Sequence, residues 1–520
     1  MDKDCFYITT TLPYVNSDPH IGFALEIVQA DVIARYKRLL GFDVFFNTGT
    51  DEHGQKVYKK ALEEGKNPQE YVDEYAAKFA NLRKALNLSY NSFIRTTDKH
   101  HKESARKLWE ICAENGFIKK GVYKSKYCVG CELEKKDSEL EKGKCPIHPN
   151  FKIEVIEEEN YFFKFSDFQE KLLYLYRKRP DFVIPGNRLK EIVNFVEEGL
   201  SDFSVSRLRE KMPWGIPVPG DEKHVMYVWF DALTNYISAL GWPGDMHKFE
   251  RFWGKESSPQ SIQFAGKDNL RQQSAMWQAM LMAANLPTSK NIIIHGFIES
   301  EGKKMSKSLG NVVDPFEYVN KYGTDAVRYF LLSKIHPFKD GDFTRAKFEK
   351  AYNFDLANKL GNLVNRVVGL TEKFSEGKVP EINRDPDTHP LRTGNELYTW
   401  KKSWKAIDEI FETYRFDRAL ESVWSFIGEA DRYIEVSKPW ELSKKNKKEE
   451  LAWVIYGLCD AVHQLAWQIL PFLPETAGSI AETFDIRGVL KENPQHKDSF
   501  SNIASHTKIN SKKPLFPRLK

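Results

Sequence analysis

The sequence predicts an α/β protein in which a parallel sheet is split by a metal-binding insertion and is followed by an all-α bundle. Three observations support this fold class. Strand and helix patterns alternate in residues 1–117 and again in 224–325, as they do in parallel sheets built from βαβ units. The intervening residues, 118–223, carry short strand patterns, turns and paired cysteines. From residue 351 onward, strand patterns fade and apolar residues follow helical spacing.

The first predicted βαβ unit lies near the start of the chain. Residues 6–12 form a β-rich run, and an apolar stripe at helical spacing follows until Gly41. The apolar run 42–46 is the second predicted strand, so strand, helix and strand follow one another. The further elements expected in the α/β part are a charged helical stretch at about 67–115, strands at 225–230, 262–265 and 292–294, and a helix at 271–284.

The residues from 351 to 520 predict helices joined by polar loops. Helical spacing of apolar residues is clearest at 356–374, and further helices are expected at 397–436 and 449–470. The polar, Lys-rich segment at about 491–513 is expected to be flexible on the surface. One all-α domain therefore follows the sheet.

Composition excludes several classes of protein. The chain has 520 residues, enough for about three domains, and six cysteines, too few for a disulfide scaffold. It has no apolar run long enough for a membrane span, and its first residues have neither a basic segment nor a small-residue cleavage site. We therefore expect a soluble cytoplasmic protein. The net charge of +4 neither requires nor forbids nucleic acid as a partner.

Four residues in the insertion have the spacing of a zinc site. Cys128 and Cys131 are separated by two residues, and Cys145 and His148 repeat that spacing thirteen residues later. Two such pairs can fill all four positions of a tetrahedral zinc ion, which predicts a structural site with no open position. Free thiols beside a chance histidine are the alternative interpretation.

Two segments suggest phosphate binding. His20 and Gly22 lie at the junction of the first predicted strand and helix, where backbone N–H groups face a ligand. Lys303, Lys304 and Lys307 lie in a later Gly- and Ser-containing loop that could close on a polyphosphate. A helix cap and a solvated turn, respectively, are the plainer interpretations.

Read together, these segments resemble the signatures of the class I aminoacyl-tRNA synthetases. His20-Ile-Gly-Phe23 stands in the place of HIGH, and Lys304-Met-Ser-Lys-Ser308 matches KMSKS in full. Within that class the chain is most similar to the methionyl-tRNA synthetase family of the bacterial type with one zinc knuckle. Further matching strings are Thr10-Thr-Leu-Pro-Tyr14, Thr48-Gly-Thr-Asp-Glu-His-Gly54, Trp214-Gly-Ile-Pro217, Tyr227-Val-Trp-Phe-Asp-Ala232 and Gly266-Lys-Asp268.

The resemblance implies a domain plan and a set of site residues. Residues 1–117 and 224–325 would be two halves of a Rossmann-type catalytic domain, 118–223 a connective insertion, 326–350 a stem-contact linker and 351–520 an anticodon-binding domain. The implied methionine site is Leu12, Tyr14, Asp51, Trp229 and Trp277; the ATP site is His20, Gly22, Arg207, Lys267, Asp268, His295, Lys304 and Lys307; and the anticodon contacts are Asn362, Arg366 and Trp440.

The implied reaction joins methionine to tRNA(Met), including the initiator tRNA, through an adenylate made from ATP with Mg²⁺. Positioning and cationic contacts supply the catalysis, so His20, Lys304 and Lys307 are the expected catalytic residues. The insertion is too short for the large editing domain of the isoleucine, valine and leucine enzymes, which favours methionine or cysteine as substrate. Trp229 stands where the cysteine enzymes place a zinc ligand. A monomer is expected because no additional C-terminal tRNA-binding or dimerisation module is evident.

The chain departs from the family pattern at two places, and other functions stay open. Phe23 replaces the second histidine of HIGH, and Gln272-Gln273 replaces an aromatic residue and a histidine, which predicts a remodelled pocket wall. The alternatives are a class I synthetase of other specificity, a catalytically weak tRNA-binding paralogue and, more remotely, a zinc-dependent nucleic-acid-binding module.

Overall fold

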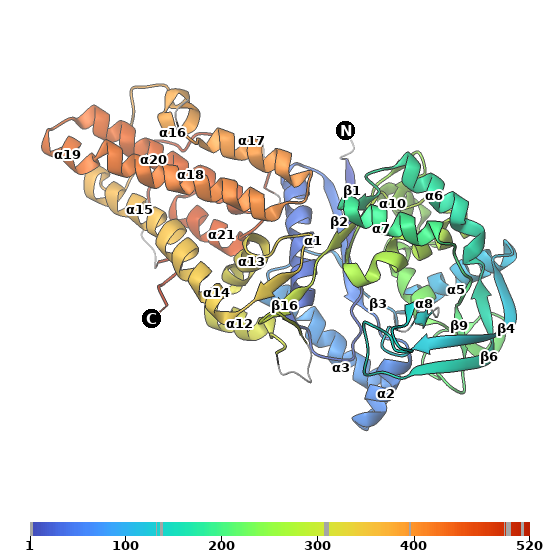
Figure 1. Cartoon of the computed structure of the whole chain (residues 1–520). Coiled ribbons are helices and arrows are strands. Elements are labelled where there is room, and N and C mark those ends of the chain that lie inside the picture. The colour runs from blue at the N-terminus through green and yellow to red at the C-terminus, as the bar shows by residue number, and fades with distance from the viewer. Residues whose placement is uncertain are drawn as a thin grey trace.

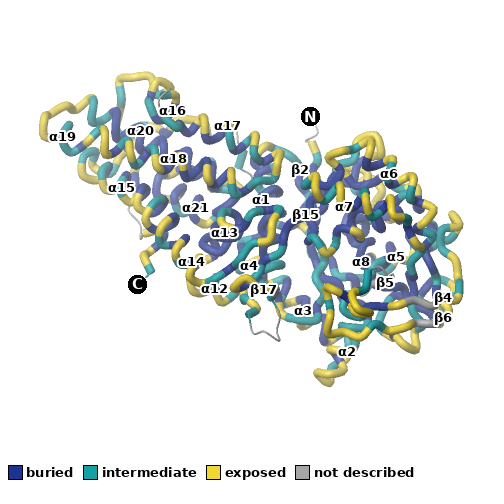
Figure 2. Tube along the Cα trace, viewed as in Figure 1, coloured by how far each residue is buried: buried dark blue, intermediate teal, exposed yellow. Residues whose placement is uncertain are grey.

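The computed structural model describes residues 4–131, 133–135, 139–305, 311–394, 397–492, 494–495, 501–510 and 514–519. Figure 1 shows an α/β part, from which β4 and β6 project at the outer end, and a helical part that extends away from it. Buried positions run through the inside of both parts, whereas exposed positions mark the outer turns (Figure 2). Among the described helices, none combines the length and apolar character needed to cross a bilayer.

A six-stranded parallel sheet forms the centre of the α/β part. The chain builds outward from β1 through β2 to β3, and later from β14 through β15 in the other direction. The order therefore reverses between β1 and β14, the position where such sheets bind ligands at their carboxyl edge. In sheet order the strands are β3 (Ser92–Arg95), β2 (Asp43–Thr50), β1 (Cys5–Thr9), β14 (Ser261–Gly266), β15 (Asn291–His295) and β7 (Val183–Ile184).

Helix α1 follows β1 and is buried along most of its length, because it lies between the sheet and the helical part. The chain begins this helix at Ile21, directly after the cap residue His20. The helices that flank the sheet are α1 (Ile21–Leu39), α2 (Gln55–Glu63), α3 (Pro68–Ala80), α4 (Leu82–Ala85), α5 (Lys99–Glu114), α8 (Val228–Leu233), α9 (Asn235–Ser238), α10 (Met246–Trp253) and α11 (Trp277–Ala283), the last preceded by a π-helical turn at Gln272–Met276.

The insertion is built on a long antiparallel hairpin rather than on short strands alone. β4 and β6 pair over their whole length, and two helices follow them. β7 lies within the range expected to be inserted, yet it pairs with β15 of the parallel sheet. The elements are β4 (Ile118–Cys128), β5 (Leu133–Lys135), β6 (Ile153–Phe163), α6 (Gln169–Lys178), α7 (Gly186–Glu197), β8 (Phe203–Ser204), β9 (Ser206–Leu208), β10 (Pro217–Val218) and β11 (Asp221–Met226).

Two expected elements are wrong. The strand expected at 225–230 is the end of β11, which pairs antiparallel with β9, followed by α8. A short apolar run has the same pattern in a buried strand and a buried helix, so its sequence could not separate them. The charged stretch at 67–115 is not continuously helical, because β3 interrupts it as an edge strand of the sheet.

A small sheet and three helices connect the α/β part to the helical part. β16 pairs with β17, which carries the first residues of the KMSKS loop, and with β18. The linker therefore touches the base of that loop. The elements of this connecting region are β16 (Ile298–Ser300), β17 (Lys303–Lys304), α12 (Pro315–Tyr322), α13 (Thr324–Ser333), β18 (Gly341–Phe343) and α14 (Arg345–Ala351).

The helical part is fixed firmly to α1. The rings of Tyr36 and Phe411 stack with centroids 3.7 Å apart, and the fully buried Arg328 forms an ion pair with Asp31 at 2.8 Å. The helices are α15 (Asn362–Ser375), preceded by a π-helical segment at Tyr352–Gly361, and α16 (Pro390–Thr393), α17 (Trp400–Phe411), α18 (Phe416–Ser437), α19 (Pro439–Lys444), α20 (Lys448–Ile469) and α21 (Pro474–Thr483).

The C-terminal tail packs against these helices where it is described, contrary to the expectation of a flexible surface segment. Ile503, Ile509 and Phe516 are buried, and a backbone bridge joins Lys378 to Lys508. Isolated apolar residues anchor a segment that is polar on average.

Candidate active site

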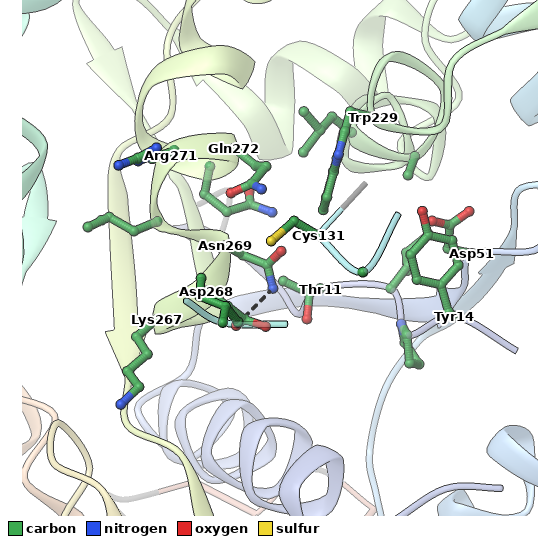
Figure 3. Close-up of a pocket in the computed structure, with 18 of the residues that line it drawn as sticks. Thr11, Tyr14, Asp51, Cys131, Trp229, Lys267, Asp268, Asn269, Arg271 and Gln272 are labelled. Atoms are coloured by element: carbon green, nitrogen blue, oxygen red, sulfur yellow. Dashed lines mark hydrogen bonds between the residues drawn. The ribbon is translucent and has the colours of Figure 1, made fainter. Parts of the chain in front are cut away.

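A cavity of about 920 Å³ opens at the carboxyl edge of the parallel sheet. Thr11 and Tyr14 follow β1, Asp51 follows β2 and Lys267 follows β14, so the ends of three strands supply its floor (Figure 3). The walls come from α8, α9 and the insertion. The cavity therefore lies at the reversal of strand order, between the two halves of the sheet.

One side of the cavity combines a carboxylate with aromatic rings. Asp51 is buried and forms an isolated parallel bridge with Tyr14, and Figure 3 shows the two side by side. Trp229, on α8, packs in one cluster with Tyr14. Leu12 also lines the cavity. This set offers a negative charge beside an apolar slot, which suits an ammonium group carried by a molecule with an apolar side chain.

Sequence reasoning missed several residues of the same wall. Trp229, Ala232, Leu233 and Tyr236 all line the cavity, at positions separated by three, one and three residues. This is the spacing of one helical face. If the segment had been predicted as a helix, this spacing would have identified Tyr236 as a residue of the cavity wall.

The structure places Trp277, which was predicted to contact methionine, behind the cavity wall. Its side chain is fully buried and lies outside the described lining of the cavity. Its ring centroid is 5.8 Å from that of Tyr236, so Trp277 supports the wall from behind. Gln272 and Gln273, the second departure from the family pattern, do line the cavity, and Gln273 Nε2 donates to the Tyr236 hydroxyl oxygen at 2.6 Å.

His20 caps α1 and lies outside the described lining of the cavity. Its Nδ1 accepts a hydrogen bond from the Gly22 backbone N–H at 3.1 Å, so the ring proton lies on Nε2 in the neutral form. Burial lowers the pKa of His20 below its ordinary value, so the ring is neutral at pH 7. A Cβ atom added at Gly22 would lie 2.9 Å from the His20 ring and 3.6 Å from the Met305 methyl group. The two signature segments are therefore neighbours.

Lys267 reaches the site from the end of β14. Lys267 and Asp268 line the cavity, and Lys267 Nζ lies 2.5 Å from Asp340 Oδ2 of the linker. A phosphate that binds Lys267 must compete with this carboxylate. Lys307 and the side chain of Lys304 lie outside the described residues.

Two residues predicted to bind ATP are engaged elsewhere. Both ring nitrogens of His295 have protein partners, Glu26 at 2.8 Å and the Gly296 carbonyl oxygen at 2.7 Å. Burial alone would lower the pKa of His295, but these contacts raise it. Arg207 lies outside the described lining and donates to Ser204 Oγ at 2.6 Å. His295 therefore supports the strand end, and Arg207 braces the insertion.

The four expected metal ligands lie together. The ligand atoms of Cys128, Cys131, Cys145 and His148 are all within 4.8 Å of one another. A Cβ added at Gly130 would lie 2.4 Å from the His148 ring, so the first knuckle has room only for glycine there. Three sulfurs and one nitrogen are a donor set that suits tetrahedral zinc.

The group of four expected metal ligands also contributes to the cavity wall. Cys131 and His148 line the cavity, and Figure 3 shows Cys131 between Trp229 and Thr11. Lys56 Nζ donates to the Gly130 carbonyl oxygen at 3.0 Å. On the other side Arg271 pairs with Glu139 of the insertion at 2.7 Å. The sequence predicted the ligand set, but it gave no signal that this cluster covers the site.

The residues expected to read the anticodon lie far from the cavity, in the helical part. Asn362 is exposed at the start of α15. Arg366, one turn later, forms ion pairs with Asp431 at 2.5 Å and with Glu435, both on α18. Trp440 is half-buried near the start of α19, the next helix along the chain and the outermost in Figure 1.

Comparisons with known proteins agree with this arrangement. The family model "tRNA synthetases class I (M)" matches residues 6–154 and 136–368. "Methionine--tRNA ligase" of Thermotoga maritima is 39% identical over 99% of this chain and 80% of the relative, and the Brucella suis biovar 1 protein of that name is 38% identical over 100% and 98%.

Solved structures show the same fold. "Mycobacterium tuberculosis methionyl-tRNA synthetase in complex with methionyl-adenylate" superposes with a TM-score of 0.91 at 34% identity, covering 99% of this chain and 100% of that one. The apo form of the Mycobacterium tuberculosis protein gives a TM-score of 0.85 at 31% identity, covering 100% and 99%.

Proposed function

Because the chain belongs to the methionyl-tRNA synthetase family of class I tRNA synthetases, we propose that it joins L-methionine to tRNA(Met) at the expense of ATP. The observation that carries this proposal is the meeting of Asp51, Trp229 and Lys267 in one cavity at the carboxyl edge of the parallel sheet. An ATP–pyrophosphate exchange assay with methionine tests it.

Methionine is held by the charged and aromatic side of the cavity. The Asp51 carboxylate accepts hydrogen bonds from the substrate ammonium group, and Tyr14 and Trp229 enclose the thioether, which packs well against aromatic rings. Tyr236 accepts a hydrogen bond from Gln273, so its own hydroxyl proton is free to point at the sulfur. This orientation leaves the substrate carboxylate at the phosphate side.

The chemistry consists of two displacements. A methionine carboxylate oxygen forms a bond to the α-phosphorus of ATP while the bond from that phosphorus to pyrophosphate breaks. A terminal ribose hydroxyl of tRNA then attacks the adenylate carbonyl, and AMP leaves. The Mg²⁺ that accompanies ATP neutralises phosphate charge. The protein supplies orientation, the Nε2–H donor of His20 and the lysine cations rather than a nucleophile.

We propose one zinc ion per chain, held by Cys128, Cys131, Cys145 and His148. Zinc-binding energy stabilises the fold of the knuckle. Because the knuckle covers the cavity and is tied to Lys56, its loss should also slow adenylate formation.

The zinc proposal predicts one equivalent of metal per chain and a lower unfolding temperature after chelation. Cys145→Ser should lose the metal and most exchange activity. Cys5→Ser, outside the knuckle, is the control and should keep both. Protein purified without chelator that lacks zinc but is fully active would exclude this site.

We propose that Asn362, Arg366 and Trp440 contact the anticodon. Single-stranded bases stack on aromatic rings and present their edges to amide and guanidinium groups. The RNA must compete with Asp431 and Glu435 for the Arg366 guanidinium.

Trp440→Ala should lower tRNA aminoacylation about 10- to 100-fold, because stacking of one base contributes ~1 to 3 kcal/mol. Methionine-dependent exchange should stay unchanged, since α19 lies far from the cavity. Phe354→Ala, which removes an exposed ring of the helical part, is the control and should leave both activities unchanged. A parallel fall in both activities of Trp440→Ala would show that this side chain has a structural role.

We propose that the active form is a monomer. Sedimentation of the purified protein tests this proposal. The cytoplasmic location stays a prediction.

A further inference from the structure

A buried carboxylate behind the methionine wall links four segments of the fold. Asp231 Oδ2 lies 2.6 Å from His53 Nδ1, and its Oδ1 lies 2.8 Å from His101 Nε2. His101 continues the chain of contacts, because its Nδ1 lies 2.9 Å from Ser238 Oγ. Asp231 and His101 are fully buried, and His53 is 3% exposed. The network joins the loop after β2 to α5, α8 and α9.

Burying such a network has a free-energy cost. Burying a charged group requires desolvation, and well-packed apolar residues of similar size often stabilise a core equally well. Burial alone would raise the pKa of Asp231, but the two histidines hold it at about 2, so the carboxylate is charged over the working pH range. The stability of the fold does not require this arrangement. Its role therefore lies in the residues that these contacts hold in position.

Both ends of the His53–Asp231 contact lie beside methionine-site residues. His53 is two residues after Asp51, the proposed ammonium partner, and Asp231 is two residues after Trp229, the aromatic wall. Ala232 and Leu233, which directly follow Asp231, also line the cavity. The 2.6 Å contact therefore fixes the separation of two opposite sides of the slot, although His53 and Asp231 are outside its described lining.

The loop that carries Asp51 is held from its other side as well. The indole Nε1 of Trp214 donates to the Glu52 carbonyl oxygen at 2.6 Å, and the Trp214 ring lies 5.5 Å from that of His53. Arg95 binds the Glu52 side chain at 2.6 Å. Because these contacts fix the loop, the His53–Asp231 contact determines the position of α8 relative to Asp51.

We propose that Asp231 is a positioning residue for methionine, which acts through His53 to hold Trp229 at the correct distance from Asp51, while His101 anchors it from α5. This inference rests on the proposed function, and it assigns a role to a network that contacts neither ATP nor tRNA in that function. A misplacement of about 1 Å in such a slot can cost up to a hundredfold.

The test is exchange kinetics on Asp231→Asn and His53→Ala. The KM for methionine should rise about 10- to 100-fold in both variants, while the KM for ATP stays within about twofold. Methionine binding measured by equilibrium dialysis without ATP should weaken by the same factor. Asp221→Asn is the matched control, because it removes another His–Asp contact, His224 Nδ1 to Asp221 Oδ2 at 3.0 Å, outside the described cavity lining. It should leave both KM values unchanged.

The remaining outcomes distinguish a positioning role of Asp231 from a purely structural role and from failure of the proposed function. Equal rises in both KM values, or a lower unfolding temperature with unchanged KM values, would overturn the positioning role. If Asp231→Asn does not unfold cooperatively, His53→Ala carries the same test, because it leaves the Asp231–His101 contact in place. If the wild-type protein supports no methionine-dependent exchange, the proposed function fails, whatever the variants show.

Discussion

Asp51→Asn should lower kcat/KM for methionine by roughly thirtyfold to several thousandfold. The substitution keeps the size of the side chain but removes the negative charge that faces the substrate ammonium group. Truncating one partner of a buried charge pair costs about 2 to 5 kcal/mol, and each 1.4 kcal/mol is about tenfold. Steady-state exchange kinetics with methionine varied at saturating ATP measure the effect.

Asp18→Asn provides the control for this experiment. Asp18 lies in the loop after β1 and forms an exposed ion pair with Lys78 at 3.0 Å. Exposed pairs contribute about 0 to 1 kcal/mol, so the control should stay close to wild type. If Asp51→Asn leaves the KM for methionine unchanged, Asp51 does not hold the ammonium group.

Lys307→Ala should slow adenylate formation about a hundredfold while changing the dissociation constant of ATP much less. A preorganised cation stabilises charge that grows on the phosphates in the transition state, and loss of one such contact costs about 3 kcal/mol. Lys304→Ala should behave in the same way. Single-turnover adenylate formation at varied ATP concentration gives the rate and the dissociation constant separately.

Lys290→Ala is the control, because Lys290 is an exposed lysine outside the signature loop and outside the described cavity lining. It should change the rate by less than about threefold, as for an exposed surface charge. If Lys307→Ala weakens ATP binding and slows the rate by equal factors, the lysine acts in the ground state.

Much of the fold could be predicted from local pattern. α1 and the strands near 262–265 and 292–294 have long or strongly apolar signals, and the structure confirms them. β3 and β7 could not be predicted, because four and two residues have too little pattern and gain their stability by pairing with β2 and β15. The same limit explains why the run at 225–230 was assigned to a strand.

The same distinction between local pattern and long-range packing applies to the residues of the candidate site. Asp51 and Trp229 lie in recognisable strings, and the structure brings them to one cavity. Which way a single side chain points depends on packing between distant segments, so the sequence could not predict that Trp277 packs behind Tyr236. It likewise predicted that Cys128, Cys131, Cys145 and His148 lie together, but not that Cys131 and His148 line the cavity, because that contact joins elements far apart in the chain.

The most direct test of the account is ATP–pyrophosphate exchange by the purified, zinc-loaded protein, measured with each of the twenty amino acids in turn. The charged, aromatic slot formed by Asp51, Tyr14 and Trp229 predicts that methionine supports exchange with the highest kcat/KM. A higher value for any other amino acid, or no exchange with methionine, would contradict the proposed function.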